Sequence, residues 1–174
     1  MDRTRLAREQ RLELTVQSLA LGGNGVARLG DLVVFVAGAY PGERVLARVT
    51  KSRSHWAEAS LVEVLAASPD RVAAPCVHFG RECGGCRSQD LAYPAQVAAK
   101  TRQVAETLAR VGGLPDVPVD ACVPSPDVYR YRNKMEFAFH PANDGTPILG
   151  LRLRLDPQGD ASGLEPGMTV WVAR

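Results

Sequence analysis

Three of the four cysteines in this 174-residue chain fall within one short, glycine-containing segment. Cys76 is followed by Cys83, and a Cys-Gly-Gly-Cys step then ends at Cys86. Thiolates at this spacing suit a metal ion or an iron–sulfur cluster, and glycine lets backbone amides approach inorganic sulfide. A disulfide or small buried thiols are the alternative, but core thiols have no reason to gather in a glycine-rich segment. We therefore predict that Cys76, Cys83 and Cys86 are metal ligands.

The sequence indicates the cysteine ligands more clearly than it indicates which metal centre they hold. Zinc sites and cubane iron–sulfur clusters both take four ligands, and structural zinc usually uses two Cys-x-x-Cys or His knuckles. This segment has one such knuckle, which favours an iron–sulfur cluster, while zinc stays open. Cys122 lies further along the chain and His78 lies inside the segment. The lack of an evident fourth ligand suggests that the chain is incomplete.

A first set of basic residues falls in a segment with the pattern of short strands. Apolar residues alternate from Leu12 to Val16, and glycine or proline turns separate further apolar runs at 32–36, 45–49 and 57–64. Five strands in residues 11–68 predict a closed or nearly closed barrel of the OB type. Such barrels often bind single-stranded nucleic acid on one face. We predict RNA contacts there from Arg28, Arg48, Lys51, Arg53 and His55, beside Trp56; a solvated rim is the alternative.

A second set of basic residues lies in residues 129–155. Tyrosine, phenylalanine and leucine alternate there with charged residues, and Asn143-Asp-Gly145 is typical of a hairpin turn. Two strands, at 129–139 and 149–155, would bury the apolar face and display positive charges on the other. RNA phosphate would offset the repulsion between those charges, and a solvated face is the alternative. The predicted RNA-binding residues of this set are Arg130, Arg132, Lys134, Arg152 and Arg154.

The remaining segments are assigned as follows. Residues 1–10 are a charged helix or a frayed end, and residues 90–113 hold an amphipathic helix that begins near Pro94 and ends at Gly112-Gly113. Residues 114–126 are a proline-rich connector, and 168–172 form a last strand. The predicted fold class is mainly β (α+β). Its domains are a charged segment (1–10), an OB-like barrel (11–68), a cysteine loop with a helix (69–113) and an incomplete antiparallel sheet (114–174).

The amino-acid composition indicates the general class of protein but not its binding partner. The chain is 45% hydrophobic and 23% charged with a net charge of +2, as in an ordinary soluble globular protein. Its start is too charged for a signal peptide, and its longest apolar run is too short to span a membrane. We therefore expect a cytoplasmic monomer with reduced thiols and no membrane partner. Eighteen arginines against three lysines suit phosphate recognition, although a GC-rich genome would give the same excess.

Taken together, these segments resemble a known family. Gly22-Gly-Asn-Gly-Val-Ala-Arg28, followed by residues 33–38 and Pro41-Gly-Glu43, resembles a TRAM domain, a small RNA-binding barrel of RNA-modifying enzymes. The cysteine loop and Tyr131-Arg-Asn-Lys-Met-Glu-Phe137 resemble the RNA uracil-C5 methyltransferases, in particular their iron–sulfur 23S ribosomal RNA branch. The resemblance covers nearly the whole chain in order.

This resemblance implies several properties of the chain. Its cofactors would be a 4Fe–4S cluster, with three ligands in the loop and a fourth at or beyond residues 170–174, and S-adenosylmethionine in the full-length protein. The implied ligand position follows the Tyr-Arg-Asn-Lys segment, so it does not pass to Cys122, which precedes it. The resemblance also implies a C-terminal S-adenosylmethionine-binding domain with a cysteine nucleophile and a carboxylate base. We expect this chain to be an N-terminal fragment that is inactive alone, with RNA as partner, rRNA rather than tRNA.

Two other functions remain open from the sequence. The chain could be a stand-alone RNA-binding module with a zinc or iron–sulfur loop and no catalysis. It could also be a small iron–sulfur redox protein, which would require four ligands within the chain and would leave the basic faces without a role.

Overall fold

The computed structural model describes residues 5–80, 83, 85–131, 133–134, 136–141, 145–152 and 169–170. The chain divides into two compact units, Met1–Ala73 with Asp90–Pro124, and Ala74–Gln89 with Ser125–Arg174. The helix therefore belongs to the barrel's unit and the cysteine loop to the other. The elements of the first unit are β1 (Arg11–Leu19), β2 (Gly25–Leu29), β3 (Leu32–Ala37), β4 (Arg44–Ser52), β5 (Trp56–Ala66) and α1 (Tyr93–Arg110).

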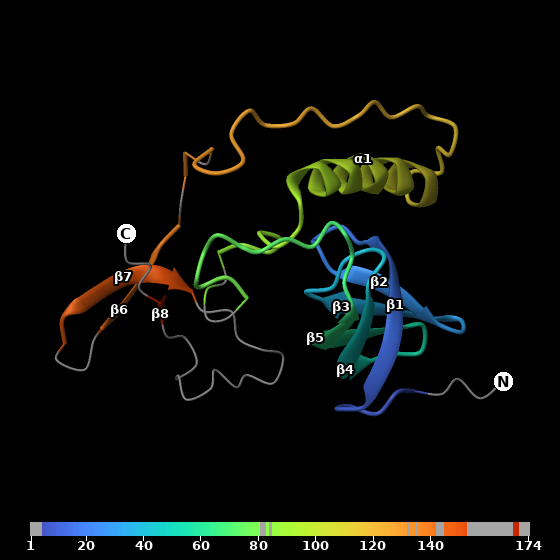
Figure 1. Cartoon of the computed structure of the whole chain (residues 1–174), viewed down its shortest axis with the longest axis horizontal. Coiled ribbons are helices and arrows are strands. Elements are labelled where there is room, and N and C mark those ends of the chain that lie inside the picture. Colours follow the sequence, from blue (N-terminus) through green and yellow to red (C-terminus); the bar gives the residue numbers. More distant parts are fainter. Residues whose placement is uncertain are drawn as a thin grey trace. The chain divides into compact units, whose positions relative to one another are not determined.

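The five N-terminal strands form a closed barrel in the order β1-β2-β3-β5-β4 (Figure 1). Strand β4 returns to pair with β1, and every pairing is antiparallel except that of β3 with β5. The predicted OB-like barrel and the mainly β class are thus confirmed. Closure leaves no free edge among these strands, so their backbone groups are paired within the barrel.

Small and β-branched residues fill the barrel interior. Buried and partly exposed residues alternate along most of each strand, since successive side chains of a strand point to opposite faces. A barrel of five strands is narrow, which suits alanine and valine. The buried core cluster comprises Leu6, Leu14, Val16, Ala27, Val34, Val36, Ala39, Val45, Ala47, Val49, Ala57 and Ala59.

The N-terminal segment extends this core instead of forming a helix. Among residues 5–10 the structure shows a turn, and Leu6 is 9% exposed within the core cluster. Backbone hydrogen bonds from Glu9 to Val49 and from Val49 to Gln10 attach the segment to β4. The helix considered for residues 1–10 is therefore wrong for the described part, because one apolar side chain and two backbone bonds hold it against the barrel.

Helix α1 forms as the sequence predicts, with Pro94 in its first turn. At its end Gly113 has a φ of +66°, and the amide of Leu114 donates to the carbonyl of Leu108, a C-terminal arrangement that favours glycine. The side-chain amide of Gln103 donates to the carbonyls of Leu19 and Ala20 at 3.1 and 2.8 Å, which docks the helix on the end of β1. No helix in the described residues is long and apolar enough to cross a membrane.

The second unit contains a small antiparallel sheet of β6 (Ala138–Pro141), β7 (Pro147–Arg152) and β8 (Thr169–Val170). The predicted hairpin exists, because Ala138 lies opposite Gly150 and Pro141 opposite Pro147. The strand predicted over 129–139 is wrong for most of its length, since the described residues before Ala138 are bends and irregular chain. The alternating pattern alone did not suffice to form a strand there, and among the described residues Phe139 is 76% exposed and Tyr131 69% exposed.

Candidate nucleic-acid interface and cysteine loop

Three of the predicted basic residues of the barrel, Lys51, Arg53 and His55, lie at the end of β4 or in the turn that leads to Trp56 at the start of β5. The ammonium group of Lys51 lies 5.0 Å from the centre of the indole ring. In the turn between β4 and β5, the amide of Arg53 donates to the carbonyl of Trp56 at 2.8 Å. His55 immediately precedes the tryptophan, and its carbonyl accepts the amide of Val33 at 3.4 Å. The structure thus places the ammonium group of Lys51 over the indole, while Arg53 and His55 adjoin Trp56 through the backbone of the β4–β5 turn.

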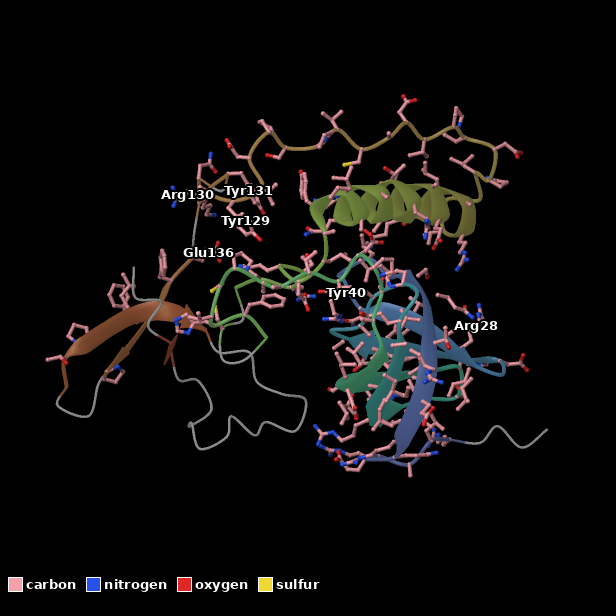
Figure 2. The ribbon with its side chains drawn as sticks, in the orientation of Figure 1. Arg28, Tyr40, Tyr129, Arg130, Tyr131 and Glu136 are labelled. Atoms are coloured by element: carbon pink, nitrogen blue, oxygen red, sulfur yellow. The ribbon has the colours of Figure 1, made fainter. Side chains whose placement is uncertain are left out.

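Arg28 lies two strands away from Trp56 on the same outer face of the barrel. It lies on β2 opposite Val33 of β3, and Val33 lies opposite Trp56 in the neighbouring ladder. Figure 2 shows the Arg28 side chain extending away from the barrel, in agreement with its exposure. Sequence analysis also missed one member, Phe35, whose ring lies 6.4 Å from that of Trp56 in an edge-to-face arrangement. Phe35 alternates with the buried Val34 and Val36, so the strand pattern could have shown that its side chain points outward.

Arg48 differs from the other basic residues of the barrel. Its guanidinium forms an ion pair with Glu9 at 3.2 Å, and only 30% of the side chain is exposed. Arg48 therefore fastens the N-terminal segment to β4, and we do not retain it in the predicted RNA-binding set.

Of the second basic set, Arg130 and Lys134 have described side chains, and neither lies in a strand. Arg130 occupies a bend with a φ of +62°, beside the exposed Tyr129 and Tyr131 (Figure 2). Lys134 forms an exposed ion pair with Glu136 at 3.4 Å, so a neighbouring carboxylate offsets its charge. Arg132 and Arg154 lie outside the described residues, and Arg152 is the last residue of β7.

The cysteine loop carries free thiols that accept hydrogen bonds from nearby N–H groups. Cys76 and Cys83 are partly buried and Cys86 is exposed. The amide of Gly85 donates to the sulfur of Cys83 at 3.4 Å, and the side-chain amide of Gln89 donates to that of Cys86 at 3.0 Å. Sulfur atoms that accept N–H hydrogen bonds are usual in iron–sulfur centres, so the donor chemistry fits such a centre. Within the described residues, however, no three His, Cys, Asp or Glu side chains are grouped closely enough to hold a metal ion.

Cys122 is held in the other unit. Its amide donates to the hydroxyl of Thr101 on α1 at 2.9 Å, which pins the connector that follows the helix. The sequence assigned no metal-binding role to the Cys122 thiol. The backbone amide of Cys122 has a structural role, because it holds the connector on α1.

The ends of the cysteine loop are joined at a neck that sequence analysis missed. Arg71 and Leu91 form an isolated β-bridge, flanked by backbone bonds from Val72 to Asp90 and from Ala92 to Asp70. The guanidinium of Arg71 also reaches the carbonyl of Gly38 at 2.8 Å and the carboxylate of Asp90 at 2.5 Å. The loop therefore leaves the barrel and returns to it at one place.

The neck is built around Glu43, a carboxylate with no exposed surface. Pro41-Gly42 forms the turn before it, with Gly42 at a φ of +85°. Burial raises the pKa of Glu43, but hydrogen bonds from Arg71 and from the amide of Tyr40 outweigh it, and the net pKa lies below the usual range. Tyr40 is buried too and donates its hydroxyl to Asp90, so burial and that carboxylate raise its pKa.

Comparison with known proteins agrees with this architecture. Residues 6–62 match the family model described as the TRAM domain, which spans the N-terminal segment and nearly the whole barrel. The chain contains a TRAM domain. Beyond the TRAM domain, similarity extends along most of the chain to proteins named uncharacterized RNA methyltransferase. The resemblance inferred from the motifs is confirmed to this extent.

Three of these relatives illustrate the extent of the match. The protein from Gloeobacter violaceus is 38% identical over 146 residues, which are 83% of this chain and 32% of the relative. That from Nitratidesulfovibrio vulgaris is 42% identical over 82% of the chain and 30% of its own length. That from Aquifex aeolicus is 40% identical over 75% of the chain and 30% of its own length. The chain with its TRAM domain thus spans about a third of the length of the curated relatives it matches.

Proposed function

We propose that this chain is the RNA-recognition part of an RNA methyltransferase. Its TRAM domain and its relatives named RNA methyltransferase support the proposal. The observation that carries it is the cation of Lys51 over the Trp56 ring, with Arg53 and His55 in the adjoining turn and Arg28 outward on β2. Cations beside an aromatic ring provide both phosphate attraction and a surface for a nucleobase.

We further propose that the full-length protein transfers a methyl group from S-adenosylmethionine to C5 of a uridine in ribosomal RNA. Uracil C5 is a poor nucleophile until a thiolate adds to C6, after which the carbon attacks the methyl group and a base removes the C5 proton. A stacked uracil hides C6, so the reaction requires a nucleotide turned out of its stack. The described residues of this chain would hold the RNA around such a nucleotide.

We also propose that Cys76, Cys83 and Cys86 supply three thiolates to a 4Fe–4S cluster, with the fourth ligand elsewhere in the full-length protein. The free thiols and their N–H donors support this proposal. Methyl transfer needs no electron carrier, so when bound the cluster would cross-link the loop and not take part in the reaction.

The experiment that tests RNA recognition is a salt titration of binding. A fluorescent ribosomal RNA stem-loop with unpaired uridines is titrated with the chain at several salt concentrations and followed by anisotropy. Each phosphate that is neutralised on single-stranded RNA contributes about −0.7 to the slope of log K against log salt. We expect Arg28→Gln and Arg53→Gln each to reduce the slope by about 0.7.

The matched control is Arg102→Gln, which removes one exposed charge from α1 and should leave the slope unchanged. A slope near zero for the unaltered chain, or equal losses for all three variants, would refute recognition by this face. Incorporation of a labelled methyl group into RNA by the full-length protein then separates a methyltransferase from a module that only binds.

A further inference from the structure

The outward side chains of β2, β3 and β5 form two aligned rows across the barrel. In one row Arg28 lies opposite Val33, and Val33 lies opposite Trp56. In the other, Val26 lies opposite Phe35 and Phe35 opposite Glu58. Residues paired across a ladder point to the same face, so these six side chains share one surface. We call it the stacking face.

The centre of the stacking face is aromatic and held in place. The rings of Phe35 and Trp56 meet edge to face with an interplanar angle of 68°, and both side chains are only partly buried. The ammonium of Lys51 also lies over the Trp56 ring, where the ring's quadrupole attracts it. A tryptophan held by two such contacts keeps its partly exposed ring in place at little cost in side-chain entropy.

Charge is arranged so that the margins of the face attract phosphate and the centre does not. Arg28 lies on the β2 side, while Lys51 and Arg53 lie on the side of β4 and the β4–β5 turn. The carboxylate in the rows is Glu58, opposite Phe35 in one ladder and Lys51 in the other. The strands are about 4.8 Å apart, so the cations bracket a strip roughly 14 Å wide. A backbone following the margins would place its bases over the aromatic strip.

Given the proposed function, we propose that the stacking face binds unpaired RNA by stacking nucleobases on Trp56. In an A-form duplex the faces of the bases are covered by their neighbours, and a protein reaches mainly the backbone and the 2′-hydroxyls. A partly exposed ring can therefore stack on the bases of a single strand but not on those of a helix. Stacking accepts any base, so the face selects for lack of pairing and leaves the choice of sequence to other parts of the protein.

The test compares one mixed-sequence 12-nucleotide RNA as a single strand and annealed to its complement, by fluorescence anisotropy at one salt concentration. We expect the full chain to bind the single strand more tightly. Trp56→Leu should weaken single-strand binding about 5- to 150-fold, the range for the loss of one stacked base, and change duplex binding less than about 2-fold. Trp56→Tyr, which keeps an aromatic ring, should remain within about 3-fold of the unaltered chain.

The control is Leu21→Ala, which truncates an 80% exposed apolar side chain in the turn between β1 and β2 and should change neither affinity. Circular dichroism verifies that each variant folds. If Trp56→Leu fails to fold, Trp56→Tyr and Lys51→Gln test the stacking face instead. Lys51→Gln should weaken single-strand binding and reduce the salt slope by about 0.7. Equal affinity for single strand and duplex, or single-strand binding unaffected by Trp56→Leu, would overturn the proposal that bases stack on Trp56. The proposal that the chain recognises RNA would still stand. Absence of binding to both RNAs overturns the proposed function itself.

Discussion

Arg71 and Glu43 form a two-point ion pair that is closed to solvent on the carboxylate side. The Nε of Arg71 lies 2.6 Å from one carboxylate oxygen of Glu43, and Nη2 lies 2.9 Å from the other. Arg71 precedes the cysteine loop, while Glu43 closes the turn between β3 and β4. The guanidinium also lies 4.6 Å from the centre of the Tyr40 ring. The barrel therefore fixes the starting point of the loop through one buried ion pair.

The first prediction concerns the loss of that pair. Arg71→Met leaves the Glu43 carboxylate buried without a cation, and it should lower the free energy of unfolding by about 3–5 kcal/mol. Urea denaturation followed by circular dichroism measures the change. Arg102→Met is the matched control, because Arg102 is exposed on α1 and its loss should cost under about 0.5 kcal/mol. Equal costs for the two variants would contradict the role of the pair.

The second prediction is the pH dependence that this pair imposes. Because the folded state depresses the pKa of Glu43, the unfolded state binds more protons between the folded pKa and the ordinary value of about 4.3. The stabilisation is complete above that value and is lost as pH falls through the folded pKa. We expect Glu43→Gln to be less stable at pH 7 and to lose less further stability below about pH 4.3. Parallel acid profiles of the two proteins would show that Glu43 does not titrate in this way.

The sequence predicted the barrel because its signals are local. Alternation in β1, apolar runs in β3 to β5 and the glycine turns between them each specify a strand or its end, and a closed barrel is the consistent way to pair them. The neck could not be predicted in this way. Glu43 and Arg71 are far apart in sequence, and Glu43 within Pro-Gly-Glu has the appearance of an ordinary exposed turn residue.

The strand predicted from Tyr129 failed for a related physical reason. Alternation describes which residues could share a face, but a strand also needs a partner and a layer that covers its apolar side. Pairing with β7 begins at Ala138, and Phe137 is still 52% exposed. Among the predicted RNA-binding residues, Lys51, Arg53 and His55 lie near Trp56 in the chain because a tight turn joins β4 to β5. Arg48 did not, because the N-terminal segment supplied an unexpected carboxylate.

The third prediction tests the packing that holds the turn before Glu43. A Cβ on Gly25 would lie 2.6 Å from the carbonyl oxygen of Ala39 and 2.8 Å from a methyl carbon of Val16. The backbone oxygen cannot move aside alone, so Gly25→Ala should destabilise the protein by about 1–3 kcal/mol in thermal or urea unfolding. Gly30→Asn is the control, because that site has a φ of +58° and open space around it, and asparagine accepts this conformation. A smaller cost at Gly25 than at Gly30 would be inconsistent with the close approach.

The fourth prediction separates the cysteines of the loop from Cys122. The loop thiols accept N–H donors in a glycine-rich segment, whereas the amide of Cys122 is tied to Thr101 on α1. In the full-length protein purified without oxygen, iron and sulfide analysis should find about four irons per chain if the loop holds a 4Fe–4S cluster. Cys83→Ser and Cys86→Ser should each lose most of this iron, while Cys122→Ser retains it. Zinc in place of iron would favour a tetrahedral zinc centre, and equal loss from Cys122→Ser would make that thiol a ligand after all.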